Sequence, residues 1–496
     1  MPHIKRSANS KGHQSNGYMK KMTLFTIAAT IIVLPAFPQG QQIKRADGKI
    51  LAKNTIDSIV NKLLDTAEIT GLQLSIINND MVTYVNSYGY KDKATHELND
   101  PNTSFYAASL AKPLFACIVM QLVDEGKIDL DKPLYQYLPK PLPEYDNYKD
   151  LASDDRYKLI TARICLDHTT GFPNFREYSP HQNNKLEIFF KPGSRYSYSG
   201  EGINLLQFVV ETVTGRSLED LAQEKIFKPF GMTRTSFRWQ PAFQSDFAHG
   251  HDFNGDTITK QRFTRQYAAG SMETTIGDYS RFVAAALQGK RLSPSARKEM
   301  FSRQILIYTK QQFNELSADS VGDNRAIDLS YGLGWGLFKT PYGPVFFKEG
   351  HGIGWVNYVI GIPAQKFALV ILCNDANGES IFKELVQDLS GVTIPWYWEN
   401  YIPYRANVRL PVSVLQQFAG EYDGKLKAFV TVEDGRLKVA SPDVGLGKTN
   451  LYATNDHHFF LKIMQTDIDF VKGPDGKVTK AVLDDEGEHY ELTRVK

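Results

Sequence analysis

The sequence predicts an α+β domain followed by a small all-β barrel, and three patterns lead to this expectation. Near the N-terminus, apolar residues recur at helical spacing and then alternate with polar residues, as in a helix followed by a hairpin. A second pair of apolar strands lies far along the chain, so an antiparallel sheet would gather strands from both chain ends. After residue 411 the chain changes to short alternating runs between glycine turns, which is typical of a small barrel or sandwich.

The first elements of the α+β domain form a helix, a hairpin and a buried helix. Residues 55–68 carry apolar side chains at i, i+3 and i+4, which predicts an amphipathic helix. Residues 72–76 alternate into an Asn78-Asn79-Asp80 turn, and residues 81–88 return as the second strand. Residues 114–123 are almost wholly apolar, which predicts a helix buried on all sides.

The later elements complete this domain. Residues 203–213 predict a helix, and residues 355–362 and 367–373 predict two strands joined by a turn at Pro363-Ala364-Gln365. A helix near residues 381–389 follows. The order of elements indicates an antiparallel sheet with helices packed against it.

The domain organisation follows from changes in residue composition and in the apolar pattern along the chain. We expect an N-terminal extension with a signal in residues 1–40, an α+β domain in 41–394, an aromatic linker in 395–411 and the barrel in 412–496. The barrel strands are expected at residues 429–432, 436–439, 458–463, 468–471, 478–483 and 490–495.

The N-terminus resembles a bacterial secretory signal. Met19-Lys20-Lys21 precedes an apolar run over residues 22–34, with Pro35, Ala36 and Gly40 behind it. The run is shorter than the ~20 apolar residues that a membrane span needs, although a single anchor is the alternative. We therefore expect cleavage near Gly40, a periplasmic or secreted protein, and no stable membrane anchor after cleavage.

Composition excludes several classes of protein. Lys and Arg total 57 against 55 Asp and Glu, a net charge of +2 without a basic run, so no nucleic-acid partner is expected. Cys117, Cys165 and Cys373 lie in apolar segments and indicate buried packing residues, not a disulfide framework or a zinc site. His249-x-His251 lacks a third spaced ligand, so we expect no metal and no cofactor.

A Ser-x-x-Lys pattern gives the candidate nucleophile. Ser109 and Lys112 stand at i, i+3, which on a helix places the hydroxyl and the amine on one face. Pro113 is best tolerated in the first helical turn, so Ser109 would lie at the helix N-terminus with its backbone NH unpaired. Ser295 and Ser380 match the same pattern, but their polar neighbours indicate solvated helix surfaces.

A second candidate lies in the segment Ser197-Tyr198-Ser199-Gly200, ahead of the helix at residues 203–213. A phenol near two lysines loses its proton more easily, so Tyr198 is a candidate base or proton donor. A loop tyrosine more often serves only in packing, and this alternative stays open.

Together these residues resemble the serine β-lactamase and penicillin-binding-protein superfamily, in particular its class C-like branch, over about residues 55 to 390. The resemblance implies an antiparallel sheet flanked by helices, an all-helical subdomain, and a lipocalin-like C-terminal barrel of the kind appended to some members. Further supporting stretches are Ile160-Thr161-Ala162-Arg163, His168-Thr169-Thr170-Gly171, Phe230-Gly231-Met232-Thr233, Ala269-Gly270-Ser271 and Tyr331-Gly332-Leu333-Gly334-Trp335.

By this resemblance Ser109 is the nucleophile, Lys112 its partner, and Tyr198 the tyrosine of a Tyr-x-Asn motif in which Gly200 replaces the asparagine. The absent amide argues against strong β-lactam turnover.

Family members carry Lys-Thr-Gly or His-x-Gly on a later strand, and two registers compete here. We favour Lys348-Glu349-Gly350, which makes Lys348 the cation near Tyr198 and the backbone NH of His351 the second oxyanion donor beside that of Ser109. Glu349 would then repel a substrate carboxylate, which favours an ester or a neutral amide.

The first functional hypothesis is an exported acyl-serine hydrolase of the esterase, D-aminopeptidase or D,D-peptidase type. Its substrate would be a small molecule or a peptide, with peptidoglycan-related compounds included. The alternative is a penicillin- or peptidoglycan-binding protein with little or no turnover. A third hypothesis, a carbohydrate-binding or adhesion barrel on a scaffold domain, has no residue that specifically supports it.

Overall fold

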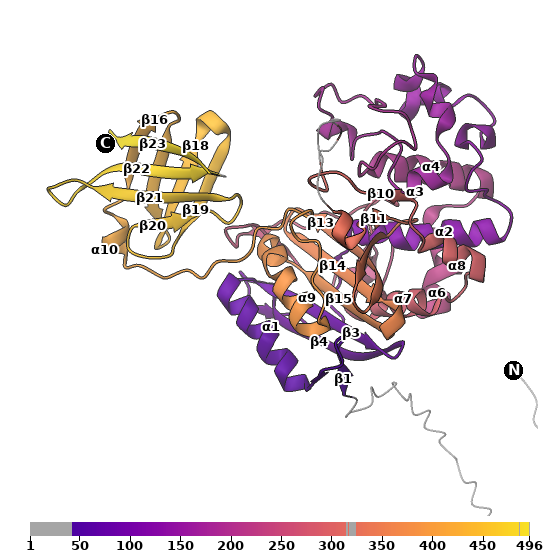
Figure 1. The fold of residues 1–496 in the computed structure, drawn as a ribbon, viewed down its shortest axis with the longest axis horizontal. Helices are drawn as coiled ribbons and strands as arrows, with labels where there is room; N and C mark the ends of the chain where they lie inside the picture. The colour runs from indigo at the N-terminus through magenta and orange to yellow at the C-terminus, as the bar shows by residue number, and fades with distance from the viewer. Residues whose placement is uncertain (1–41, 314–315, 317–323, 486, 496) are drawn as a thin grey trace, which may run out of the picture. The chain divides into compact units, whose positions relative to one another are not determined.

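The computed structural model describes residues 42–313, 316, 324–485 and 487–495. The expected signal segment, residues 1–40, lies outside the described residues. The described chain contains a nine-stranded antiparallel sheet, in the order β10-β11-β12-β13-β14-β15-β3-β4-β5, and a closed barrel (Figure 1). The predicted fold class, α+β followed by an all-β barrel, is confirmed.

Strands from the two ends of the α+β domain meet in the centre of its sheet. Helix α1 (Lys53–Ala67) precedes the hairpin of β3 (Gly71–Asn78) and β4 (Met81–Asp92). Strands β14 (Trp355–Ile362) and β15 (Phe367–Cys373) have the bounds that the sequence predicts. Strand β15 pairs with β3, which joins the N-terminal hairpin to the C-terminal strands.

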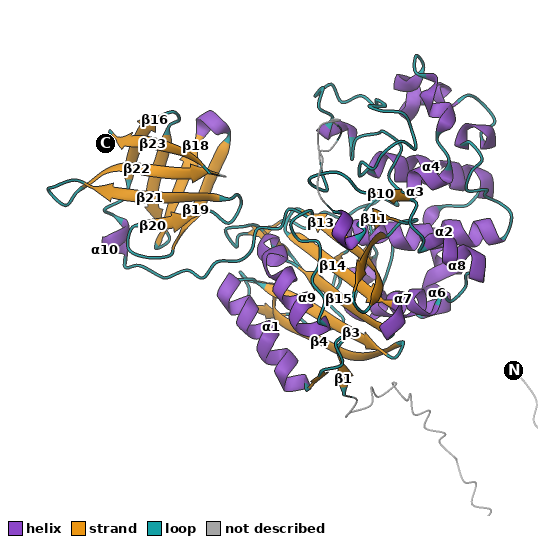
Figure 2. Ribbon diagram, in the orientation of Figure 1, coloured by secondary structure: helices purple, strands orange, loops and turns teal. Residues whose placement is uncertain are grey.

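Helices cover both faces of this sheet (Figure 2). Alternation along β15 explains why both faces need a cover, since Leu369 and Ile371 belong to one hydrophobic core and Val370 and Leu372 to another. Helices α1 and α9 (Phe382–Ser390) pack in the first core, and α2 (Ala111–Asp124) and α7 (Ile276–Gln288) pack in the second.

An all-helical subdomain extends from α2, as the family resemblance implies, and appears in magenta in Figure 1. The buried side chains of this subdomain share one core with α2 and with one face of the sheet. Its helices are α3 (Ala162–Leu166), α4 (Gly200–Thr214), α5 (Leu218–Ala222) and α6 (Lys228–Phe230), with α8 (Pro294–Met300) beside α2.

The remaining strands of the sheet are β5 (Glu97–Leu98), β10 (Ile305–Leu306), β11 (Ser330–Tyr331), β12 (Gly336–Thr340) and β13 (Gly343–Gly352). Three two-stranded pairs lie outside it: β1 (Ile43–Lys44) with β2 (Ile50–Leu51), β6 (Phe105–Tyr106) with β9 (Glu273–Thr274), and β7 (Gly250–His251) with β8 (Thr257–Ile258).

The C-terminal barrel closes from eight strands around its own apolar core. All six predicted strands are present, and the sequence analysis missed β16 and β19. Glycines at both ends of β16, and the Gly-Lys-Thr run that follows the first residue of β19, hide the alternation of these strands. The strands are β16 (Gly420–Gly424), β17 (Ala428–Glu433), β18 (Arg436–Ser441), β19 (Leu446–Ala453), β20 (His458–Phe460), β21 (Thr466–Lys472), β22 (Val478–Asp485) and β23 (Glu488–Arg494), with the short helix α10 (Val412–Leu415) before them.

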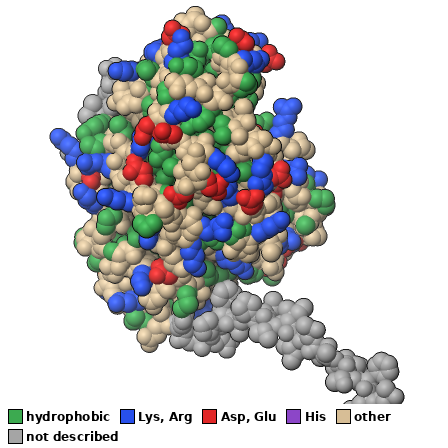
Figure 3. Space-filling model, turned by 90° about the vertical axis from the view of Figure 1, so that its right-hand side faces the viewer, with side chains coloured by type: hydrophobic (Ala, Val, Ile, Leu, Met, Phe, Trp, Pro, Cys, Tyr) green, Lys and Arg blue, Asp and Glu red, His purple; other side chains and the backbone are tan. Residues whose placement is uncertain are grey.

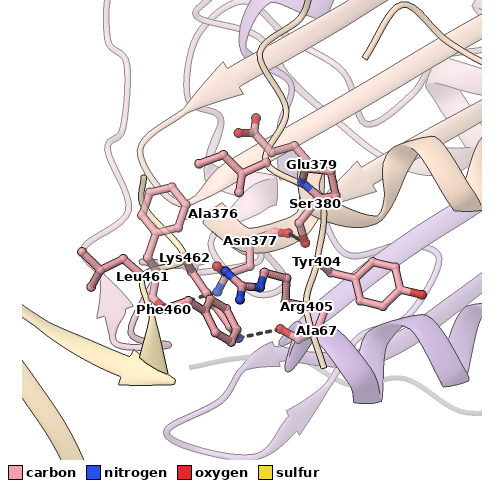
Figure 4. Close-up of a pocket in the computed structure, with 13 residues that line it drawn as sticks. Ala67, Ala376, Asn377, Glu379, Ser380, Tyr404, Arg405, Phe460, Leu461 and Lys462 are labelled. Atoms are coloured by element: carbon pink, nitrogen blue, oxygen red, sulfur yellow. Dashed lines mark hydrogen bonds between the residues drawn. The ribbon is translucent and has the colours of Figure 1, made fainter. Parts of the chain in front are cut away.

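Polar contacts join the barrel to the end of α1. Lys462 donates a hydrogen bond to the carbonyl oxygen of Ala67 at 2.9 Å, beside a cavity of about 30 Å³ (Figure 4). Glu68, the residue after α1, forms ion pairs with Arg436 and with Lys462. One acidic residue of the α+β domain therefore forms ion pairs with two basic residues of the barrel.

The surface and the cysteines agree with the balanced composition. Acidic and basic side chains are interspersed over the face shown in Figure 3. Cys117, Cys165 and Cys373 are free, buried thiols, as expected. Among the described residues, no helix combines the length and the apolar character that crossing a membrane requires.

Candidate active site

The candidate nucleophile lies where a short helical turn enters a buried helix. Ser109 belongs to a 3-10 turn over Ala108–Leu110, and α2 begins directly after it. Ala108 is buried and has φ +48°, a left-handed conformation that residues other than glycine rarely adopt. A strained backbone next to a partly exposed hydroxyl is characteristic of a functional position.

Lys112 contacts the candidate nucleophile directly. Its Nζ atom lies 2.8 Å from Ser109 Oγ and donates to the carbonyl oxygen of Ala269 at 2.5 Å. The side chain is fully buried. Burial, and then the positive charge of Lys348, hold the pKa of Lys112 well below its ordinary value. A neutral amine in this position can accept the hydroxyl proton of Ser109.

Tyr198 lies between the two lysines. The Nζ atoms of Lys112 and Lys348 are 4.9 and 4.8 Å from the centroid of its ring. Its buried hydroxyl has no well-formed hydrogen bond to any described residue. Burial raises the pKa of Tyr198, and the charge of Lys348 opposes this rise. Tyr198 is therefore a neutral phenol, which can donate a proton to a leaving group.

Strand β13 brings Lys348 and Gly350 to the nucleophile side of the site. A Cβ atom added at Gly350 would lie 2.6 Å from the carbonyl oxygen of Ala107, so this strand approaches the backbone before Ser109 closely. The Asn357 amide donates to the carbonyl oxygens of Tyr106 and Gly350 and joins the two segments. This placement is compatible with the Lys348-Glu349-Gly350 register.

The neighbouring residues of β13 have other partners. His351 Nε2 lies 3.0 Å from Glu379 Oε2, and the imidazole is partly exposed at the cleft. Glu349 is only 1% exposed and forms an ion pair with Lys348. The expectation that Glu349 would face a substrate carboxylate was wrong, because this side chain pairs with Lys348 and does not line the cleft.

Gly200 starts helix α4 and is packed against the loop before it. Its NH donates to the carbonyl oxygen of Asn174 at 2.9 Å. A Cβ atom at Gly200 would lie 2.8 Å from a ring carbon of Phe175. A larger residue therefore cannot take this position without movement of Phe175. Gly200 does not line the cleft, whereas Asn204, one turn later on α4, does.

Three residues near the site carried no signal of their own in the sequence. His168 is fully buried at φ +59°, and its ring packs against Tyr198 in a tilted arrangement with centroids 4.3 Å apart. Its Nδ1 accepts the backbone NH of Ser199 at 3.2 Å, which fixes the loop that carries Tyr198. Asn357 and Gln312 were also missed, because their partners lie far away in sequence. His168 opens a stretch that contributed to the resemblance, but its contact with Tyr198 could not be derived from it.

A cleft of about 1160 Å³ opens beside Ser109, between the sheet and the helical subdomain. Ser109, Ala269, Gly270 and His351 lie on its wall. The remaining lining is mixed, with charged and amide side chains such as Arg176, Glu201 and Lys260 beside a set of aromatic ones: Tyr106, Tyr148, Phe175, Tyr178, Phe263, Tyr267 and Trp355. The cleft can therefore hold a substrate that carries apolar or aromatic groups near the reacting bond.

The other sequence candidates lie away from this cleft. Ser295 is exposed on α8 and bonds to Ser293, and Ser380 donates to the Asn377 carbonyl oxygen in a 3-10 turn. The nitrogens of His251 contact backbone groups of Lys93 and Asn374, so its position is structural.

Comparisons with known proteins identify the family to which most of this chain is similar. The family model described as Beta-lactamase matches residues 56–389. A penicillin-binding protein of Bacillus subtilis (strain 168) is 22% identical over 481 residues, which cover 89% of this chain and 98% of that protein.

Two solved structures share the fold. The octameric penicillin-binding protein homologue from Pyrococcus abyssi has a TM-score of 0.56 at 18% identity, covering 90% of this chain and 100% of that one. The D-alanine carboxypeptidase AmpC from Burkholderia cenocepacia has a TM-score of 0.52 at 20% identity, covering 65% of this chain and 93% of that one.

Proposed function

This chain belongs to the beta-lactamase family, and from that membership we propose that it is an acyl-serine hydrolase with Ser109 as its nucleophile. The observation that carries the assignment is the 2.8 Å contact between Lys112 Nζ and Ser109 Oγ at the edge of the cleft. A buried neutral lysine this close provides the base that a serine hydroxyl needs.

The chemistry follows from the protonation states. Lys112 takes the proton of Ser109 Oγ while Oγ forms a bond to the acyl carbon of the substrate. The backbone NH groups of Ser109 and His351 hold the negatively charged oxygen. The acyl bond to the leaving nitrogen or oxygen breaks, and the Tyr198 phenol supplies a proton to the leaving group. The proton on Lys112 restores the phenol, and water then hydrolyses the acyl-serine ester.

The substrate is an ester or an amide with an apolar or aromatic group. This preference rests on the aromatic lining of the cleft. Repulsion by Glu349 does not argue against a substrate that carries a carboxylate, because Glu349 is paired with Lys348 inside the protein. Peptides with D-amino acids are within this class, and the carboxypeptidase named above shares the fold.

The test is active-site labelling followed by turnover assays. A fluorophosphonate probe should label wild-type protein once, at Ser109, and Ser109→Ala should abolish the labelling. Mapping of the label to Ser295 or Ser380 would refute the assignment. Panels of p-nitrophenyl esters, D-amino-acid peptides and nitrocefin then identify the substrate class. A stable acyl-enzyme with negligible turnover of all these substrates would favour the alternative, a penicillin-binding protein. The residue that specifically supports this alternative is Gly200, where the side-chain amide of the family is missing.

Export is a second part of the proposal, and it rests on the residue pattern of the N-terminus. We propose that the mature chain begins near Gln41 and lies in the periplasm or outside the cell. N-terminal sequencing of protein from an exporting bacterium tests this. A chain that still begins at Met1 or Met19 would contradict it.

A further inference from the structure

Glu349 is the buried partner of the second lysine of the site. Its Oε1 atom accepts hydrogen bonds from Lys348 Nζ and from the side-chain amide of Gln312. Lys348 also donates to the backbone carbonyl oxygen of Glu349 at 2.9 Å. Lys348, Glu349 and Gln312 have exposed fractions of 0%, 1% and 1%. The acid and the lysine therefore form an ion pair shielded from solvent.

Such a pair persists as two charges. An unpaired charge in a protein interior is unfavourable, so removal of either partner leaves the other in an unfavourable state. Burial favours the neutral form of Lys348, but the Glu349 carboxylate and, after it, Tyr198 together outweigh burial and raise the pKa of Lys348. Burial likewise favours neutral Glu349, and Lys348 lowers the pKa of this acid.

Glu349 carries the negative charge close to the two lysines, because the neighbouring acid and tyrosines are neutral. Burial raises the pKa of Glu399 well above its ordinary value, so this second buried acid is neutral. Burial also raises the pKa values of the surrounding tyrosines, which stay neutral phenols. The titratable groups that face Glu349 are Lys348 and His351 of β13, Lys112 of α2, Tyr196 and Tyr198 before α4, Tyr331 of β11, Tyr358 of β14, and Glu399 and Tyr401 after α9.

The consequence concerns which lysine carries the proton. The Nζ atoms of Lys112 and Lys348 lie 4.9 and 4.8 Å from the centroid of the Tyr198 ring. Two positive charges this close to one ring would repel each other. Of the two lysines, only Lys348 has a carboxylate of the described residues in direct contact. The charge of Glu349 also raises the pKa of Lys112, but by less than the charge of Lys348 lowers it. We propose that Glu349 is a positioning residue that fixes the proton on Lys348 and thereby leaves Lys112 neutral as the base for Ser109. This inference deepens the proposed function and rests on it.

The test compares the pH dependence of Ser109 labelling in wild type and Glu349→Gln. The rate constant of fluorophosphonate labelling is measured from pH 6 to pH 11, with folding checked by thermal unfolding at each pH. In Glu349→Gln, the largest contribution that opposes burial is lost, so Lys348 loses its proton, and the site loses its cation beside Tyr198, at lower pH. The fall in rate at high pH should move down by about one pH unit or more, so that labelling at pH 10 is about 3-fold or more slower than in the wild type. Superimposable profiles would overturn the inference.

Glu399→Gln is the matched control. It makes the same change at a second buried acid, but at one that is already neutral, so no charge is lost. Its profile should keep the wild-type position. Equal displacement in both variants would show that general disturbance of the core moves the profile, and this result would also overturn the inference. Glu349→Asp keeps the charge and should restore most of the wild-type profile.

The wild-type profile provides a second, independent readout if Glu349→Gln does not fold. With Lys348 held protonated, labelling of the wild type should not decline below about pH 10. A decline that begins below about pH 9 in folded wild-type protein would refute the role of Glu349. Absence of any label on Ser109 in the wild type would instead refute the proposed function, so the two failures are distinguishable.

Discussion

The Nζ atom of Lys112 lies 2.8 Å from the Oγ atom of Ser109, one helical turn away, and the lysine side chain is completely buried. This contact predicts that Lys112→Ala lowers the rate of Ser109 labelling by about 100-fold or more, the scale of a positioned base. Lys112→Arg should be equally poor, because a guanidinium group does not give up its proton. Lys298→Ala, in the exposed Ser-x-x-Lys match on α8, should change nothing.

The contact between Lys112 and Ser109 also predicts how the rate of Ser109 labelling changes at low pH. Because burial and the charge of Lys348 lower the pKa of Lys112, this lysine is protonated only at low pH. Labelling should therefore rise with pH and level off well below the ordinary lysine value of about 10.4. A rate that continues to rise up to that value would show that Lys112 titrates as an ordinary lysine and is not the base.

Paired substitutions on β13 test the register of the site. Lys348→Ala should cut turnover by about 100-fold or more, because it removes the cation beside Tyr198. His351→Ala should cost much less, because its imidazole contacts Glu379 and only its backbone NH is assigned to the oxyanion. Steady-state kinetics on one ester substrate measures both. A larger loss in His351→Ala would place the site in the His-x-Gly branch.

Much of the fold could be predicted because its signals are local. The β14 and β15 strands are continuous apolar runs bounded by turn residues, and their predicted bounds agree with the structure. The β19 strand was missed because Gly447 and Lys448 interrupt its apolar pattern. Local patterns of this kind do not depend on the rest of the chain.

The interior of the site could not be predicted in the same way. Gln312 contacts Glu349 across 37 residues of sequence, and Asn357 contacts Tyr106 across 251. No local sequence pattern around either amide predicts its partner. The direction of the Glu349 side chain depends on these long-range contacts, and for this reason the expectation about substrate charge failed while the residues around Ser109 came together.

Asp167 predicts a pH dependence of stability. It is buried at the end of α3 and accepts a hydrogen bond from Thr169 Oγ1 at 2.6 Å. Burial raises its pKa to about 7. The folded pKa exceeds the unfolded one, so the contribution of Asp167 to stability is full below about pH 4 and is lost as the pH rises through 7.

Asp167→Asn should remove this dependence. Between pH 4 and pH 8 the free energy of unfolding of the wild type should fall relative to that of the variant, by on the order of 3 kcal/mol. Urea unfolding at several pH values measures the difference. Asp155→Asn, at an exposed acid, is the control and should run parallel to the wild type. Parallel curves for Asp167→Asn as well would contradict the prediction.

Removal of the barrel tests its relation to the active site. A chain that ends at Pro411 loses the contacts of Glu68 with Arg436 and Lys462, so its unfolding temperature should fall. Ser109 labelling should persist, because the residues around Ser109 all precede the barrel. A truncated protein that unfolds cooperatively but cannot be labelled would show that the barrel completes the site.

The final prediction concerns Gly200, the residue that replaces the family asparagine. A Cβ atom there would lie 2.8 Å from Phe175 and 2.9 Å from the carbonyl oxygen of Asn174. Gly200→Asn should therefore lower the free energy of unfolding by about 1–3 kcal/mol, as overpacking does, and should not create nitrocefin hydrolysis. Gly215→Asn, at φ +63° at the other end of the same helix, meets no atom within 4 Å and should cost less, because asparagine tolerates this conformation. Combining Gly200→Asn with Phe175→Ala should recover part of the lost stability. Equal losses in the two glycine variants, or nitrocefin turnover by Gly200→Asn alone, would show that Phe175 does not exclude the amide from this position.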